Sequence, residues 1–348
     1  MLNVFERSGL AAGHVPMQEA AVHRLLREHY GIEGSLTRFE TEKDDTFRVT
    51  RENGERLVLK IANPEETLEE IDFQNCLMRH AAACDPELPI PAIVPNVDGN
   101  NTFRITDVDG SARSVRALTY LEGTPLCETD SSSRERVQIG RMLGRLRLGT
   151  EGFSHPAEDR KYAWDVQHLL TLESLLDEVD NPDQRMALED GLERFRMIEP
   201  EVRALRRQVL HNDFSKSNII VDHGEPEFVT GIIDFGDSVK TAIAIDVSTA
   251  CLNQLPESPH EDLFWRARDI VEGYLQVAEL TDQELSLIPH LTFARVVTRA
   301  LLTSWRAKRF PGNVRYIMRN THQGWHQLEW FLARQPYELS GLLMNCAT

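Results

Sequence analysis

The sequence predicts an α+β fold in two lobes, in which a small antiparallel sheet precedes a mostly helical region. Three observations support this prediction. Apolar residues alternate at strand spacing in the first third of the chain, and they recur at helical spacing through most of the rest. A strand-like insert at 209–233 interrupts the helical part. The length of the whole chain, 348 residues, also favours two lobes. We therefore predict an N-lobe over 1–118, a hinge over 119–123 and a C-lobe over 124–348.

The N-lobe is predicted to contain two helices and an antiparallel sheet. Apolar residues recur at helical spacing from Pro16 to Tyr30, and Gly31 can end that helix. The pair Asn53-Gly54 indicates a hairpin turn between two strands. The second helix is expected over 64–83. The expected strands are 36–39, 47–50, 56–62, 102–107 and 114–121.

The C-lobe is predicted to be helical on both sides of the insert. Ser131, Ser132 and Ser133 precede the first of these helices, and serine commonly caps a helix start. The expected helices are 134–148, 165–179, 182–195, 263–278, 281–305 and 323–332.

The insert carries a motif with the spacing of a phosphoryl-transfer centre. His211, Asp213 and Asn218 follow one apolar strand, and Asp234-Phe235-Gly236 follows the next. Protein kinases place these residue types in the same order, as H-R-D-x-x-x-x-N and then D-F-G. The reaction needs a carboxylate to accept the hydroxyl proton, and oxygen ligands for Mg²⁺. We therefore predict a protein-kinase-like fold, with Asp213 as the catalytic base and Asn218 and Asp234 as metal ligands.

Two further residues of this loop have alternative interpretations. Lys216 lies between the base and the metal ligand, where a cation could stabilise the transferring phosphoryl group. A solvated loop lysine would fit the same position. We predict that His211 is a packed, hydrogen-bonded structural residue and not a proton carrier.

Lys60 is predicted to bind nucleotide phosphates. It lies in the apolar segment Leu57-Val58-Leu59-Lys60-Ile61, which has the form of the V-A-I-K strand of kinases. A charge in such a strand needs a partner, and phosphates with an acidic helix residue would supply one. The candidates on the helix are Glu69, Glu70 and Asp72. The alternative is an edge lysine that extends to water.

The hairpin before Lys60 is predicted to cover the phosphates, although it lacks a G-x-G-x-x-G sequence. Its segment 42–47 ends in Thr46 and Phe47. The backbone amides of this segment and the Thr46 hydroxyl could contact a phosphate.

Two arginines on an apolar helix are candidates for substrate binding. Arg295 and Arg299 are one helical turn apart, and a buried guanidinium is costly without a partner. The partner could be an acidic side chain of the protein. It could instead be a substrate carboxylate, which arginine holds through two hydrogen bonds.

Composition excludes several classes of protein. The net charge of −17 argues against a nucleic-acid partner, and it would suit either a cationic substrate or simple solubility. Five scattered cysteines without a C-x-x-C pair predict a reducing, cytoplasmic setting. We expect neither a signal peptide nor a membrane span.

With these motifs the chain resembles the aminoglycoside phosphotransferase and choline kinase-like superfamily, and within it the hydroxylysine kinase group. The resemblance covers about 34–328. Besides the motifs already described, it depends on segments shared with that superfamily. These are 118–123, Trp164-Asp165 and Ile245-Asp246-Val247. Arg295 and 311–316 resemble a more restricted signature of the hydroxylysine kinase group.

The resemblance implies roles for further residues. Backbone groups of Thr119 and Leu121 would bond the adenine or guanine of ATP or GTP. Asp246 would be a buried structural residue that holds the catalytic loop. Asp72 would be the helix partner of Lys60. The substrate pocket would include Asp237, Arg295 and Tyr316.

The predicted function is Mg²⁺-dependent phosphorylation of a hydroxyl on a small, amine-bearing metabolite. A hydroxylated amino acid such as 5-hydroxylysine is the first candidate substrate. An aminoglycoside or an amino alcohol, of the choline, ethanolamine or homoserine kind, is the alternative. A non-catalytic kinase-like binding module and a protein kinase remain as further hypotheses, and the sequence leaves the oligomeric state open.

Overall fold

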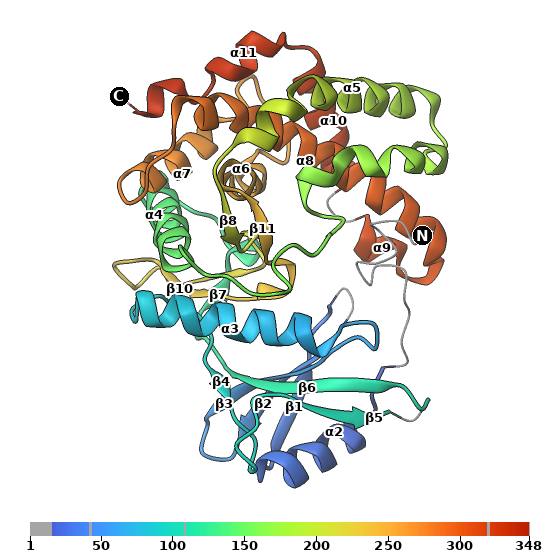
Figure 1. Ribbon diagram of the computed structural model, residues 1–348, viewed down its shortest axis with the longest axis vertical. Helices are drawn as coiled ribbons and strands as arrows, with labels where there is room; N and C mark the ends of the chain where they lie inside the picture. The colour runs from blue at the N-terminus through green and yellow to red at the C-terminus, as the bar shows by residue number, and fades with distance from the viewer. Residues whose placement is uncertain (1–15, 42–43, 108, 319–320, 348) are drawn as a thin grey trace.

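The computed structural model describes residues 16–41, 44–107, 109–318 and 321–347. A twisted sheet with helices α2 and α3 forms one end of the molecule, and a group of helices forms the other (Figure 1). The connection between the two ends leaves the sheet where β6 ends at Thr119, and β7 begins at Thr124. The antiparallel N-terminal sheet and the helical C-terminal region agree with the sequence prediction.

The N-terminal sheet is antiparallel, with six strands in the described residues. Its order is β1-β2-β3-β6-β4, and β5 pairs with β6 beside β4. The Asn53-Gly54 turn joins β2 to β3, as predicted, and Gly54 has a φ of 85°. The strands are β1 Gly34–Arg38, β2 Asp45–Arg51, β3 Arg56–Ile61, β4 Ile93–Val94, β5 Phe103–Thr106 and β6 Ala112–Thr119.

The two faces of this sheet have different environments because side chains alternate along each strand. Phe47, Leu59 and Ala117 are paired across β2, β3 and β6, and they are buried in a core that includes Val22 and Leu26. That core is closed by α2 (Glu19–Leu25), which continues as a wider π turn over Leu26–Tyr30. Residues one position along each strand point to the opposite face.

That opposite face carries a polar row. Thr46, Lys60 and Arg116 are directly paired across the same three strands. Helix α3 (Leu68–Cys84) runs along this side, between the sheet and the C-terminal helices (Figure 1). It begins later than predicted because Asn63 O accepts the Glu66 amide in a turn, and Thr67 then forms a capping box with Glu70.

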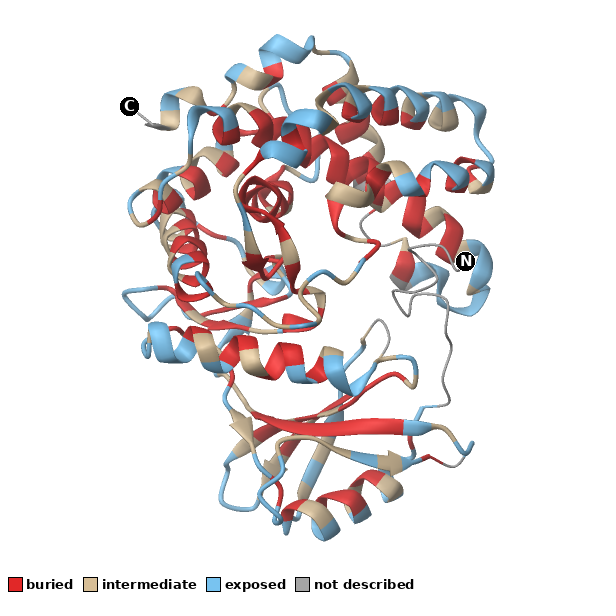
Figure 2. Cartoon of the chain, in the orientation of Figure 1, coloured by how far each residue is buried: buried red, intermediate tan, exposed pale blue. Residues whose placement is uncertain are grey.

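The C-terminal region packs its helices around α6 and α8, which are largely buried along their lengths (Figure 2). Among the described residues, α8 alone is long and apolar enough to cross a membrane, but 89% of that window is buried inside the protein. The helices are α4 Ser133–Gly149, α5 Pro182–Ala204, α6 Ile243–Gln254, α7 Trp265–Leu275, α8 Asp282–Arg309, α9 Val314–Ile317, α10 Thr321–Leu332 and α11 Pro336–Gly341. The helix predicted at 165–179 is a 3₁₀ helix over Val166–Glu178.

Short strands between α5 and α6 position the predicted motif. β8 (Arg207–Leu210) pairs with β11 (Val239–Ala242), and β9 (Ile219–Val221) pairs with β10 (Val229–Ile232). β7 (Thr124–Pro125) adds to β9. Gly123 allows this approach, because a Cβ atom there would lie 2.7 Å from Val221 O. The loop 211–218 is therefore held between β8 and β9, at the base of the connection to the N-terminal sheet.

Candidate active site

Asp213 and Asn218 lie at the two ends of the β8–β9 loop and contact each other. The Asn218 amide Nδ2 donates to Asp213 Oδ2 at 2.7 Å and to the Asp213 carbonyl at 3.1 Å. This commits the amide nitrogen to Asp213 and leaves the Asn218 amide oxygen as the atom able to bind a cation. The Asn218 carbonyl accepts the amide of Ile233, the residue before Asp234, at 2.9 Å. The structure therefore brings the two halves of the predicted motif together.

Asp234 lies at the end of β10 with an unusual backbone conformation. Its φ of 63° is in the left-handed region, which a residue with a side chain seldom adopts, and strain of this kind concentrates at functional sites. Its side chain is half exposed. Asp234 Oδ1 lies 3.0 Å from Lys60 Nζ, so this bond joins the N-terminal sheet to the motif.

Lys60 is held by two carboxylates. Besides Asp234, Asp44 Oδ2 lies 3.8 Å from its ammonium group. Burial works to lower the pKa of Lys60, but the negative charges of Asp234 and Asp44 outweigh it and raise the pKa above its usual value. Lys60 is therefore a fixed positive charge beside Asp234.

The backbone between His211 and Asp213 is fixed by buried polar groups. The His211 Nδ1 atom accepts the Asp213 amide at 3.3 Å, so Nε2 carries the proton and donates to the Ile233 carbonyl at 3.0 Å. Burial lowers the pKa of His211, which keeps the ring neutral. Asn212 has a φ of 61°, and its amide donates to Asp246 Oδ1 at 2.7 Å. Together these bonds fix the backbone from which the Asp213 side chain extends.

Asp246 is buried at the start of α6. Burial raises its pKa to about 7, although the Asn212 amide and the charge of Arg295 work in the opposite direction. Arg295 Nη2 donates to the Asn212 carbonyl at 3.4 Å. Asn212 is thus held from both sides, by α6 and by α8.

Arg295 and Arg299 form a cationic pair beside the catalytic loop. Arg295 is 5% exposed, and its guanidinium lies 5.4 Å from the ring centroid of Trp164. The buried Nη1 of Arg295 has no hydrogen-bond partner in the described part of the chain. Arg299 Nη2 donates to the neutral amide of Gln327 at 2.7 Å. Burial and the charge of Arg295 lower the pKa of Arg299 to about 10. No bond to a carboxylate is seen for either arginine within the described residues.

Arg116 is a cation of this site that the sequence analysis missed. It lies directly opposite Lys60 on β6, and it is buried. Its guanidinium donates to the side-chain amide oxygens of Gln74 and Asn75 on α3, the latter at 2.7 Å. Burial lowers its pKa, and the charges of Glu66, Asp44 and Asp234 oppose that shift. Arg116 is a charged residue in a mostly apolar strand, as Lys60 is, so the same sequence pattern could have identified it.

The predicted pairing of Asp72 with Lys60 is wrong. Asp72 lies on the outer side of α3, with a side chain that is 66% exposed, and its carboxylate contacts His155. Helix periodicity turns Ile71, Gln74 and Asn75 inward instead. The polar inward residues bind Arg116, so amide groups on α3 connect this helix to the sheet.

The structure narrows which atoms of two N-lobe residues could contact a nucleotide. The Phe47 side chain is in the core under α2, so the predicted contact stays with its backbone. The Thr119 amide donates to the Ala92 carbonyl at 2.9 Å, and its hydroxyl accepts the Ala92 amide, so the Thr119 carbonyl is the backbone group to which the prediction for a base now applies. Thr46 does share the face of Lys60, and its buried hydroxyl has no partner in the described residues.

The remaining predicted residues are placed as follows. Burial lowers the pKa of Lys216, and the carboxylates that act on its ammonium are Glu257 and Asp130, which lie outside the motif. Leu121 is half-buried in the connection between β6 and β7, and Asp237 is half-buried with its carbonyl bonded to Asn212. Tyr316 is in α9, but its side chain is outside the described residues.

The donor set fits a hard divalent cation. The Asn218 amide oxygen and the Asp234 carboxylate follow adjacent strands and are joined through the Asn218–Ile233 backbone bond. Neutral and anionic oxygens are the ligands such cations prefer. With Asp213 beside them and Lys60 on the facing sheet, the arrangement can bind a metal–phosphate group and accept a proton from a nearby alcohol.

Comparison with known proteins identifies the family. The phosphotransferase enzyme family model matches residues 35–280 of the chain, which include both halves of the motif and Lys60. The chain belongs to this family. The resemblance drawn from the sequence is confirmed, and the protein is a phosphotransferase that acts on a hydroxyl group of a small molecule. Phosphotransfer in this family depends on a nucleotide and a divalent metal.

Curated relatives of this phosphotransferase include small-molecule kinases. The mouse hydroxylysine kinase is 26% identical over 359 residues, covering 92% of this chain and 94% of the relative. A homoserine kinase from Agrobacterium fabrum is 26% identical over 277 residues, covering 75% of this chain and 74% of the relative.

Solved structures share the fold. A microcompartment-associated aminopropanol kinase superposes with a TM-score of 0.74 at 17% identity, over 90% of this chain and 98% of that one. The amicoumacin kinase hAmiN, in complex with AMP-PNP, Ca²⁺ and amicoumacin, gives 0.67 at 19% identity, over 88% and 94%. The predicted bilobal kinase-like fold is confirmed.

Proposed function

We propose that this phosphotransferase transfers the γ-phosphate of ATP or GTP to the hydroxyl of a hydroxylated α-amino acid, with 5-hydroxylysine as the first candidate. The observation that carries this proposal is the Arg295–Arg299 pair beside the catalytic loop. A buried guanidinium without an acidic partner is costly, and a substrate carboxylate would offset that cost. Hydroxylysine and homoserine, the substrates in the names of two groups of relatives, both carry a carboxylate.

We assign the catalytic steps to the residues of the motif. The substrate hydroxyl oxygen attacks the γ-phosphorus, the bond to the β-phosphate oxygen breaks, and the hydroxyl proton passes to the Asp213 carboxylate. The Asn218 Nδ2 bond at 2.7 Å orients that carboxylate. General-base assistance of this kind contributes about 10²–10⁴ in rate.

Asn218 and Asp234 would hold the metal, for which we propose Mg²⁺. When bound, Mg²⁺ neutralises charge on the nucleotide phosphates. Lys60 would bind the same phosphates from the sheet, with the Thr46 hydroxyl beside it in the same row. Because Lys60 and Asp234 pair with each other at 3.0 Å, nucleotide binding would replace this bond with bonds to phosphate and metal.

Leu121 and Asp237 also enter the proposal. We place Leu121 in the nucleotide-binding hinge, and Asp237 at the edge of the substrate site. Lys216 is not assigned a catalytic role, because the carboxylates that act on it lie outside the motif. Within the described residues the five cysteines form no disulfide bond, which supports a reducing compartment such as the cytoplasm.

A phosphorylation screen tests this function. The purified protein with Mg²⁺ and either ATP or GTP is assayed for ADP or GDP release against 5-hydroxylysine, homoserine, 1-amino-2-propanol and an aminoglycoside. Mass spectrometry of each product verifies phosphate on the substrate. We expect the highest kcat/KM for a hydroxy amino acid. A preference for the amino alcohol or the aminoglycoside would contradict the assigned substrate class, and no turnover of any acceptor with a bound nucleotide would favour a binding module.

A further inference from the structure

The outward face of α3 carries potential metal ligands at every turn. Asp72, Cys76, His80 and Cys84 are spaced four residues apart, and side chains at this spacing lie on one face of a helix. The chain that follows α4 runs beside this face, because His80 Nε2 lies 3.0 Å from the Glu151 carbonyl. None of these four side chains takes part in the proposed phosphoryl transfer.

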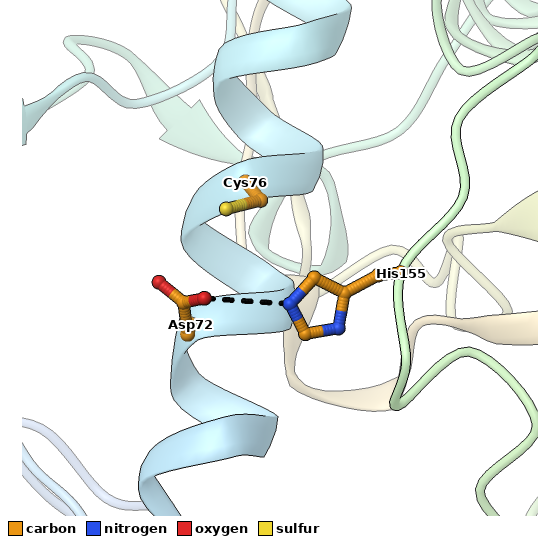
Figure 3. A group of neighbouring side chains, drawn as sticks. All are labelled: Asp72, Cys76 and His155. Atoms are coloured by element: carbon orange, nitrogen blue, oxygen red, sulfur yellow. Dashed lines mark hydrogen bonds and ion pairs between the residues drawn. The ribbon is translucent and has the colours of Figure 1, made fainter.

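His155, from the chain beyond α4, completes a cluster with the first two of these side chains. Its imidazole points at α3 with Nε2 3.3 Å from Asp72 Oδ2, and Cys76 lies one turn along the helix (Figure 3). The ligand atoms of Asp72, Cys76 and His155 lie within 4.8 Å of one another. Among the described residues this is the one group of three cysteine, histidine or carboxylate side chains whose ligand atoms lie within that distance.

Aromatic rings pack around His155. The ring centroid lies 5.5 Å from that of Phe73, and Phe153 stacks on it at 6.4 Å. The His155 side chain is 11% exposed, whereas that of Asp72 is 66% exposed. The cluster is therefore packed on the inner side and open to solvent on the outer side, so an ion can enter.

We propose that Asp72, Cys76 and His155 bind a divalent metal ion of the zinc class, which joins α3 to the segment between α4 and the 3₁₀ helix. Thiolate, imidazole and carboxylate are the ligands that zinc takes, and a water molecule would complete a tetrahedral site. The thiolate also distinguishes this site from the Asn218 and Asp234 pair, whose oxygen atoms suit a harder cation.

The proton balance of binding follows from the hydrogen bonds. The Ala157 amide donates to His155 Nδ1 at 3.1 Å, so Nε2 carries the ring proton and donates it to Asp72. The metal takes the Nε2 lone pair, the ring proton moves to Nδ1 by exchange with water, and the Ala157 bond is given up. The Cys76 thiol loses its proton to solvent, so one proton is released per ion bound.

This release makes binding depend on pH. One proton released per ion implies about a tenfold loss of affinity for each unit by which the pH falls.

A metal ion at this position would add to the contacts that already join α3 to the chain after α4, such as the bond between His80 and the Glu151 carbonyl. Helix α3 also holds Arg116 through Gln74 and Asn75, so a metal ion on its outer face would fix the helix from both sides. We expect zinc to raise the thermal stability of the protein through these bonds.

Cobalt titration of the full-length protein tests the site, because a thiolate bound to Co²⁺ gives a charge-transfer absorption in the near ultraviolet that oxygen ligands do not. We expect one equivalent of Co²⁺ to produce this band, and Zn²⁺ to displace it. Cys76→Ser should remove the band, and Asp72→Asn or His155→Gln should weaken Co²⁺ binding at least tenfold. The matched control is Cys84→Ser, two turns further along the same face, which should leave the band intact.

Three outcomes would overturn the proposal. One is wild-type protein that gives no thiolate band with Co²⁺. Another is a band that persists in Cys76→Ser, and the third is a band that disappears in Cys84→Ser, which would place the metal on His80 and Cys84. Circular dichroism and metal-free melting of each variant show whether its fold is retained. Zinc should raise the melting temperature of wild-type protein and of Cys84→Ser but not that of Cys76→Ser.

Discussion

Arg295→Gln should separate substrate binding from structural support at the catalytic loop. Arg295 Nη2 donates to the Asn212 carbonyl at 3.4 Å, and the guanidinium lies over Trp164. Its buried Nη1 has no hydrogen-bond partner among the described residues, and in the proposed function a substrate carboxylate supplies one. Glutamine can keep a bond to Asn212 but lacks the charge. The variant should therefore lose affinity for a carboxylate more than it loses the shape of the loop.

The magnitude follows from the value of a charged hydrogen bond. Such a bond contributes about 1.5–3 kcal/mol, and about 1.4 kcal/mol corresponds to a factor of ten. The assay measures kcat/KM for 5-hydroxylysine and for the same hydroxy diamine without its carboxylate. We expect Arg295→Gln to lower the ratio of the first value to the second by roughly 10- to 150-fold.

The ratio between the two substrates makes the test independent of structural damage. A distorted loop would slow both substrates alike, whereas a lost carboxylate contact slows only the one that has a carboxylate. Arg309→Gln, an exposed arginine near the end of the same helix, is the matched control and should leave the ratio unchanged. An equal loss for both substrates in Arg295→Gln would refute the carboxylate assignment.

Three further variants test other parts of the site. Asp234→Asn should weaken Mg²⁺-dependent nucleotide binding about tenfold or more, and unchanged affinity by calorimetry would contradict its role as a metal ligand. Gln74→Ala should lower the free energy of unfolding by about 1.5–3 kcal/mol in urea, because it removes a buried bond to Arg116; a loss below about 0.5 kcal/mol would mean that the bond contributes little. Burial raises the pKa of Asp246 to about 7, so the folded state keeps a proton that the unfolded chain releases near pH 4. Stability should therefore fall by up to about 4 kcal/mol as the pH rises from 4 to 7. Asp246→Asn should remove this decline, and an identical pH profile in the variant would show that the carboxyl does not titrate in this window.

The motif could be located from the sequence because its residues lie close together along the chain. A loop of fixed length between two short strands determines how Asp213 and Asn218 meet, and the pair is indeed bonded at 2.7 Å. The strand containing Lys60 could be predicted in the same way, from a single charge among apolar residues.

The sequence did not show which side of an element faces the site. Phe47 and Thr46 are adjacent in β2, so they point to opposite faces of the sheet, and only the pairing with Lys60 shows which one shares its face. To predict the partner of Asp72, the rotation of α3 about its own axis would have to be known. That rotation is set by packing of the apolar face of α3, which places Gln74 inward.

Contacts between distant segments could not be read from the sequence. The bond between Asp234 and Lys60 joins positions 174 residues apart, and that between Asn212 and Asp246 depends on how α6 packs. The 3₁₀ helix over Val166–Glu178 has the apolar spacing of an α-helix in sequence, and Asp165 caps it in the folded chain.

The most direct test of the phosphoryl-transfer centre is Asp213→Asn, in which kcat and nucleotide affinity are measured on the same preparation. The asparagine side chain can still accept the Asn218 bond but cannot take a proton. Turnover of the best hydroxy amino acid should fall by about 10²–10⁴, while the Kd for the Mg²⁺–nucleotide complex changes less than about threefold. Near-wild-type turnover with intact binding would contradict the assignment of Asp213 as the base, and with it the proposed mechanism.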